Sequence, residues 1–183
     1  VLSRNEVHDC SYSAFSLGAK RCRIESNLVY DCMKVLSDGA GFYFGGTSLQ
    51  NLVRGNLVRD VRDAPGSGSY AYYVDELGSS NVFEGNGSLR VVRPVMVHMA
   101  SNNVFRNNVF IGDGNLLLRF PKSAGQVLER NILLAESGIS FEFGGVSRWQ
   151  DNLFFTRSGR FSFDTSSKLL SAAGLEITLR RAG

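Results

Sequence analysis

The sequence predicts an all-β fold, a right-handed parallel β-helix (solenoid) of about seven coils with three strands per coil. Three observations predict it: an asparagine that recurs at a coil-sized interval, an apolar residue at a fixed position before it, and a later segment of alternating side chains. With 183 residues and 43% apolar side chains, the chain can bury a continuous core. The repeat occupies residues 1–165, and residues 166–183 are predicted to form a C-terminal cap or tail. Because the repeat is already under way at Val1, we expect a longer solenoid.

The asparagine repeat supplies the first two observations. Successive asparagines are 22, 29, 30, 22, 23 and 21 residues apart, and an apolar residue lies three positions before each one. Such a coil stacks its strands about 4.8 Å apart, with the apolar side chains inside. We expect the asparagine at a tight bend, because it tolerates a left-handed backbone and bonds to neighbouring backbone groups. An antiparallel β-sandwich is the alternative, but its strands do not repeat one residue type at one register. The asparagines are Asn5, Asn27, Asn56, Asn86, Asn108, Asn131 and Asn152.

The third strand of each coil is predicted from apolar pairs that flank a single residue, as in Phe42-Tyr43-Phe44. Strand alternation sends the flanking residues into the core and the middle residue outward. Aromatic and polar side chains aligned on one face suit a sugar or another extended polar ligand. The expected outward residues are Ser16, Tyr43, Tyr73, His98, Arg119, Glu142 and Ser162.

Two coils exceed the others by seven or eight residues, and the extra residues fall just before the third strand. They span Met33 to Gly39 and Arg62 to Tyr70, so two loops should form a wall beside the outward residues. Asp38 lies in the first loop and Asp75-Glu76 follow the next strand, which places carboxylates about 5 to 12 Å apart. Two carboxylates across a sugar-sized gap can hydrolyse a glycosidic bond. The alternative is that Asp38 only holds a turn before Gly39.

The cysteines and charges restrict the partners. Cys10 and Cys32 lie at equivalent positions one coil apart, which favours two small, buried and reduced side chains in one ladder. Three cysteines without a Cys-x-x-Cys motif do not indicate a disulfide framework or a metal site, so we expect no cofactor. A net charge of +3 from scattered residues indicates no nucleic-acid partner, and no apolar run is long enough for a membrane span.

Three segments resemble bacterial right-handed β-helix proteins of pectin-lyase-like fold that are related to β-helical glycoside hydrolases acting on xylosides or fucosides. They are VLSDGAGFY at 35–43, VRGNLVRDV at 53–61 and YVDELGSS at 73–80. The resemblance covers roughly residues 1–157. Ala40 stands where these proteins usually have glycine, and Leu77 interrupts their Glu-Gly pair.

The resemblance implies a carbohydrate-active enzyme, secreted or periplasmic, with an oligo- or polysaccharide as its partner. Asp38, Asp75 and Glu76 would be its catalytic carboxylates, and His98 would lie beside them and contact sugar hydroxyls. We expect Tyr43, Tyr73, Arg119 and Glu142 to bind substrate as well.

Two other functions stay open. A polysaccharide lyase would use Arg93 or Arg119 as the cation that stabilises developing charge. A non-catalytic β-helix would bind carbohydrate or serve a structural role. Self-association through an exposed end of the solenoid is a further expectation.

Overall fold

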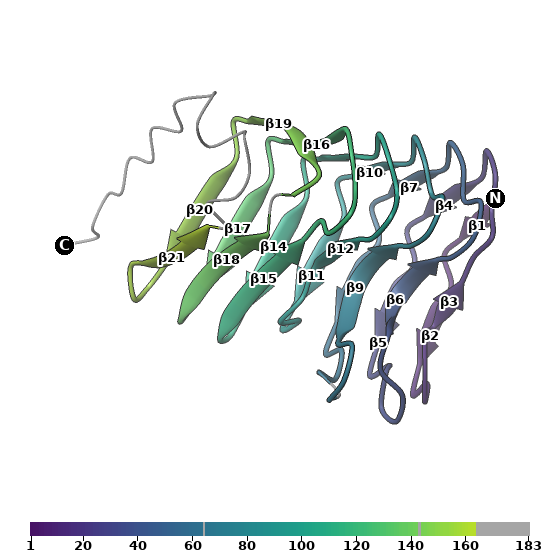
Figure 1. Cartoon of the computed structure of the whole chain (residues 1–183). Helices are drawn as coiled ribbons and strands as arrows, with labels where there is room; N and C mark the ends of the chain where they lie inside the picture. The colour runs from purple at the N-terminus through teal and green to yellow at the C-terminus, as the bar shows by residue number, and fades with distance from the viewer. Residues whose placement is uncertain (64, 143, 164–183) are drawn as a thin grey trace.

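The computed structural model describes residues 1–63, 65–142 and 144–163, and their regular elements are twenty-one short β-strands in three parallel sheets (Figure 1). The first sheet contains β1 (Leu2–Ser3), β4 (Arg23–Glu25), β7 (Leu52–Arg54), β10 (Val82–Glu84), β13 (Val104–Arg106), β16 (Gln126–Glu129) and β19 (Val146–Gln150). The second sheet contains β2 (Glu6–His8), β5 (Leu28–Tyr30), β8 (Leu57–Arg59), β11 (Gly87–Leu89), β14 (Val109–Gly112), β17 (Ile132–Ala135) and β20 (Leu153–Thr156). The third sheet contains β3 (Phe15–Ser16), β6 (Gly39–Phe44), β9 (Ser69–Val74), β12 (Val95–Val97), β15 (Asn115–Arg119), β18 (Gly138–Glu142) and β21 (Arg160–Phe163).

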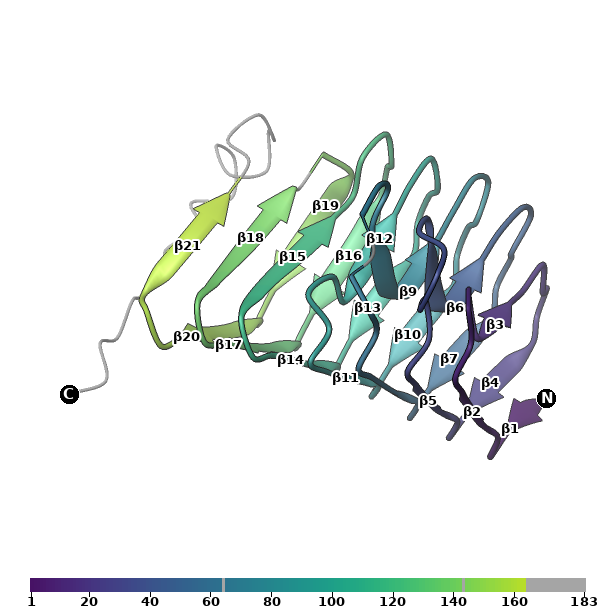
Figure 2. The ribbon, with the colours of Figure 1, turned by 90° about the horizontal axis from the view of Figure 1, so that it is seen from below.

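Each coil contributes one strand to each sheet, and every strand pairs in parallel with its equivalent in the adjacent coils (Figures 1 and 2). The predicted register is confirmed where the repeat is clearest. Ile24, for example, pairs with Val53, and Phe105 pairs with Leu128. The chain is therefore a parallel β-solenoid of seven coils with three strands per coil.

The repeated asparagines form a continuous ladder between the first and second sheets. In each step the backbone N–H and the side-chain NH₂ of one asparagine both donate to the side-chain oxygen of the next, as from Asn27 to Asn56 at 2.9 Å. The NH₂ also donates to a carbonyl in the preceding coil. Asn27, Asn56, Asn86, Asn108 and Asn131 are at most 2% exposed, so the ladder satisfies polar groups that the bend would otherwise leave buried and unpaired.

One detail of the bend differs from the prediction. The left-handed residue is the one before the asparagine, for example Ser26 with φ 56° and Gly55 with φ 61°. Asparagine therefore serves as the hydrogen-bonding residue of this bend, and its neighbour takes the left-handed backbone.

A second polar ladder runs along the corner between the third and first sheets. The Asn51 side-chain oxygen accepts from the N–H of Cys22, and the ladder continues through Asn81 and Asn103 to Gln126. These four side chains are at most 1% exposed. Each again follows a residue with positive φ, such as Gln50 or Gly125. Two of the three corners of the coil thus combine a residue of positive φ with a buried, hydrogen-bonded amide side chain.

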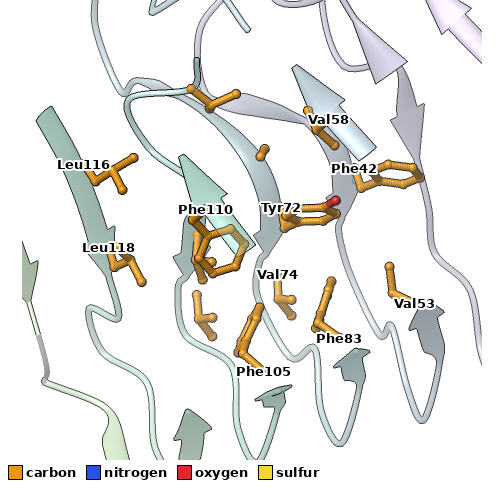
Figure 3. Close-up of a cluster of buried hydrophobic side chains, with 14 of the residues drawn as sticks. Phe42, Val53, Val58, Tyr72, Val74, Phe83, Phe105, Phe110, Leu116 and Leu118 are labelled. Carbon is orange, nitrogen blue, oxygen red and sulfur yellow. The ribbon is translucent and has the colours of Figure 1, made fainter. Parts of the chain in front are cut away.

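Stacked apolar side chains fill the interior (Figure 3). The rings of Phe42 and Tyr72 stack with centroids 5.7 Å apart, and those of Phe83 and Phe105 with centroids 4.6 Å apart. The hydroxyl of Tyr72, which lies in this core, has the carbonyl oxygens of Asn56 and Gly87 as acceptors for its single proton, at 3.1 and 2.9 Å. Rows of this kind bind each coil to the next through dispersion and the hydrophobic effect.

An irregularity in β6 and β9 interrupts strand alternation. The register passes from Ala40–Tyr70 directly to Phe42–Tyr72, and Ala71 and Tyr72 both belong to the interior core. A Cβ at Gly41 would come within 2.7 Å of the Val58 side chain, so glycine fits there. Ala40 and Tyr70 consequently lie outside the coil, in a separate apolar cluster.

The two predicted long connections precede β6 and β9 and project beyond the neighbouring coils (Figure 1). They lie side by side, because the Asp38 N–H donates to the Gly68 carbonyl at 2.7 Å and the Arg62 guanidinium donates to the Lys34 carbonyl at 2.8 Å. The last residues of the second insertion, from Ser69, belong to β9. Met33, the first residue of the first loop, is fully buried.

The cysteines are free, and Cys10 and Cys32 occupy equivalent positions in adjacent coils, since each carbonyl accepts from a backbone N–H of the next coil. Cys32 is buried, whereas Cys10 is only partly buried. The prediction that Cys10 is buried is therefore wrong, because it lies in the first coil and is stacked on one side only.

The predicted cap or tail at residues 166–183 lies outside the described residues. Among the residues described, no helix could cross a membrane.

Candidate functional site

The outward side chains of the third sheet form one row across six coils. We call them the outer row, and strand pairing aligns its members in the order Ser16, Tyr43, Tyr73, Met96, Arg119 and Glu142. The prediction is wrong for two members of this row, His98 and Ser162. Met96 takes the position expected for His98, and Ser162 pairs with Ser140, two residues before the row.

The displaced His98 lies beside Asp75, and the two side chains meet Tyr43 in one hydrogen-bonded group. The Tyr43 hydroxyl donates to Asp75 Oδ2 at 2.7 Å, and His98 Nδ1 lies 2.9 Å from Asp75 Oδ1. Parallel stacking places the three residues in successive coils, at the C-terminal ends of β6, β9 and β12. The Asp75 side chain is 16% exposed and that of His98 is 26% exposed, so both can be reached from solvent.

These contacts set the charge of Asp75. Partial burial raises the pKa of its carboxyl, but the hydrogen bonds from Tyr43 and His98 outweigh burial and bring the pKa below the usual aspartate value. Burial, followed by the bond to Asp75, raises the pKa of the Tyr43 hydroxyl. Near neutral pH the site therefore holds an ionised carboxylate and a protonated tyrosine.

Tyr73 was expected to contact substrate, but it is only 3% exposed. Its ring packs against Tyr43 and Tyr70, with centroids 5.0 and 5.1 Å away, and Met96 belongs to the same cluster. The side chain does point out of the coil, yet its neighbours cover it. It supports the ring of Tyr43 and does not face solvent.

Arg119 and Glu142 continue the outer row past the tyrosines. Arg119 donates to Glu142 at 2.9 Å and to the Tyr70 hydroxyl at 3.3 Å. Both charged side chains are about a third exposed, at 31% and 39%. Arg93 is likewise paired, with Asp63 of the second long loop. The two arginines considered for a lyase are thus already neutralised by carboxylates.

Asp38 stands at the opposite end of β6 from this group. It has φ 62°, its N–H bonds to Gly68, and its carbonyl accepts from the Tyr12 hydroxyl at 2.6 Å. These bonds fix the backbone turn, whereas the carboxylate of Asp38 is exposed and has no hydrogen bond to any of the residues that the structure describes.

The distance between the predicted carboxylates follows from the register. Asp38 directly precedes β6, whereas Asp75 directly follows Val74, which pairs with the last residue of β6. Seven residue steps, from Asp38 through the six residues of β6 to the position level with Asp75, separate their backbones by up to about 23 Å at 3.3 Å per residue. The two backbone positions are therefore farther apart than the 5–12 Å expected for the carboxylates, and the distance between the carboxylates themselves stays a prediction. Glu76, which is exposed, adjoins Asp75.

Both aspartates nevertheless act on the same tyrosine. Burial raises the pKa of the Tyr73 hydroxyl, and the charges of Asp75 and then Asp38 raise it further.

Tyr12, Tyr70 and Met96 also belong to the candidate site and were not predicted. Met96 could have been found, because Val95-Met96-Val97 alternates as well as Val97-His98-Met99 does. Within the described part of the chain, no group of three histidine, cysteine or acidic residues is placed to hold a metal ion.

Fold and site together define a parallel β-solenoid with a polar, aromatic outer face. The chain belongs to the right-handed β-helix family, whose description is "Right handed beta helix region" and which matches residues 1–171. No curated protein and no solved structure matches the chain.

Proposed function

We propose that this β-helix is a carbohydrate-active protein that binds an oligosaccharide along the third sheet and hydrolyses a glycosidic bond beside Asp75. The observation that carries the proposal is the carboxylate of Asp75, which is reachable from solvent, ionised, and fixed by one neighbour on each oxygen. A carboxylate in this state suits a glycosidase nucleophile or base. Tyr43, His98, Arg119 and Glu142 supply hydroxyl-binding groups on either side.

The proton donor is one of the two exposed carboxyls. Glu76 adjoins Asp75 along the chain, and Asp38 lies across the tyrosines. The two assignments predict different effects of substitution on hydrolysis. If Glu76 is the acid, Glu76→Gln abolishes hydrolysis and Asp38→Asn does not, and the reverse holds if Asp38 is the acid.

A second candidate is a carbohydrate-binding β-helix without catalysis. The distance between the backbones of Asp38 and Asp75 favours it over a hydrolase that uses this pair, because a hydrolase needs two carboxyls about 5–9.5 Å apart. The lyase has no comparable support, since its candidate cations are held in ion pairs with Asp63 and Glu142.

The test measures hydrolysis and binding together. Wild-type protein is incubated with xylo-, fuco- and other oligosaccharides, products are separated chromatographically, and binding is followed by calorimetry. We expect Asp75→Asn to lower kcat/KM by at least about 100-fold while sugar binding persists. Asp113→Asn, an exposed aspartate between β14 and β15, is the control and should be fully active. Binding without products in the wild type would support the non-catalytic candidate, and neither binding nor products would overturn the proposal.

A further inference from the structure

The outer face of the second sheet carries an apolar surface that the proposed function does not use. Two outward rows run along this sheet in strict register, one through Leu57, Gly87, Val109, Ile132 and Leu153, the other through Arg59, Leu89, Ile111, Leu134 and Phe155. From β11 to β20 each outward position is aliphatic, aromatic or glycine. We call Leu57, Leu89, Val109, Ile111, Ile132, Leu134, Leu153 and Phe155 the apolar face.

The side chains of this face are open to solvent. Leu57, Val109 and Ile132 are 36–39% exposed, and in the last coil Leu153 and Phe155 reach 60% and 42%. Isolated exposed apolar residues need no explanation, but a contiguous patch on a soluble protein marks an interaction surface. This patch is continuous, because parallel pairing sets neighbouring residues of each row about 4.8 Å apart from coil to coil.

We propose that a second copy of this chain docks face to face on the apolar face. The outward positions from β11 to β20 carry no charge and no hydrogen-bonding side chain, so they suit neither a sugar nor a nucleic acid. A flat aliphatic surface is matched by another flat aliphatic surface, and each copy of the chain supplies one.

The charge distribution favours a two-fold arrangement. At the other end of the same sheet the outward residues include, beside Leu28, the polar group of Glu6, His8, Tyr30 and Arg59, in which Tyr30 donates to Glu6 and stacks between His8 and Arg59. A two-fold axis through β14 and β17 would superpose the apolar faces of both copies. It would leave the charged ends in solvent.

The area predicts a weak dimer. At 150–250 Å² for a large side chain, the exposed fractions of the five most open residues amount to about 400 Å² per chain, so a pair would bury about 1,000 Å² with the rim included. Ion pairs such as Glu84–Arg106 and Glu129–Arg130 border the face and would form that polar rim. An interface of this size is typical of weak, transient association, and we expect a dissociation constant on the order of 10–100 μM.

The experiment is sedimentation velocity at protein concentrations from about 5 to 500 μM, a range that brackets the expected constant. Wild-type protein should pass from monomer to dimer, and added sulfate should strengthen the dimer because its contacts are apolar. Ile132→Lys should weaken it at least tenfold, since the two-fold axis brings the new charges together. Val35→Lys is the matched control, because Val35 is an exposed valine of the first long loop, 71% exposed, and should leave the dimer unchanged.

Leu153→Lys provides a second variant if Ile132→Lys does not fold, and circular dichroism verifies both. A wild-type monomer at each concentration overturns the proposal. So does a dimer that both lysine variants leave intact, which would place the contact at an end of the solenoid. Binding of the monomer to neutral lipid vesicles through the same residues would assign the face to a lipid surface and would equally overturn it.

Discussion

Asp75 receives one hydrogen bond from the coil before it and one contact from the coil after it, so its environment depends on three coils at once. The sequence singled out Asp75, Tyr43 and His98, because each lies in or beside a strand of the third sheet. The resemblance implied that His98 lies beside the acidic residues, but strand alternation alone did not show that it approaches Asp75, since the Val95–Val97 segment permits two alternating registers. Packing selects the one in which Val95 and Val97 are fully buried. The burial of Tyr73 was also beyond prediction, because Tyr70 covers it only after the irregularity in β9 turns Tyr70 outward.

The pH dependence of stability tests the charge state of Asp75. Its pKa in the folded protein lies below its value in the unfolded chain, so ionised Asp75 stabilises the fold above about pH 4. This contribution is lost as the pH falls through the folded-state pKa. We expect Asp75→Asn to lower the free energy of unfolding in urea by about 1 kcal/mol at pH 7, because solvent screens part of the interaction, and by less at pH 3. An equal loss at both pH values would contradict the assignment.

Thiol reactivity tests the placement of the cysteines. Burial, followed by the proximity of Cys10, raises the pKa of the Cys32 thiol to about 12, whereas Cys10 and Cys22 are partly exposed. A thiol reagent at pH 8 should modify Cys10 and Cys22 in the native protein and all three cysteines after unfolding, with the sites identified by mass spectrometry. Rapid modification of native Cys32, or fewer than three thiols after unfolding, would be inconsistent with the structure.

At the scale of the element, the asparagine ladder was predicted because its members repeat with the same neighbours. The second ladder was not, although Asn51, Asn81 and Asn103 have coil-sized spacing. Its members have no fixed apolar residue before them, and not all of them are asparagines. The ladder begins at Cys22 and ends in Gln126, whose longer side chain accepts a backbone N–H bond as the asparagines do. A polar ladder therefore depends on hydrogen-bonding geometry more than on residue type.

A single substitution measures what the first ladder contributes. Asn108 accepts from Asn86 and donates to Asn131 at 2.9 Å and to the Phe83 carbonyl at 3.0 Å. Removing these bonds leaves buried groups unpaired on both sides, so Asn108→Ala should cost about 3 kcal/mol in urea unfolding. Asn115→Ala, at an exposed position, should change the free energy of unfolding by less than about 0.5 kcal/mol. Equal effects of the two substitutions would show that the ladder follows the fold without stabilising it.

At the scale of the whole molecule, the second and third sheets present outer faces of different character. The third sheet gathers the tyrosines and charges of the candidate site, and the second sheet is charged near its start and apolar near its end. The division into sheets and coils followed from the repeat, because each coil has the same pattern. What each surface binds could not be derived in the same way, since it depends on loops and registers that vary between coils.

The most direct test of the proposed function is a crystal structure of Asp75→Asn soaked with a panel of oligosaccharides. The substitution should block turnover and hold an uncleaved sugar in place. The account predicts a sugar on the outer face of the third sheet, within hydrogen-bonding distance of residue 75 and of Tyr43 or His98, and extending toward Arg119. Sugar bound only on another face, or none from the whole panel, would contradict it.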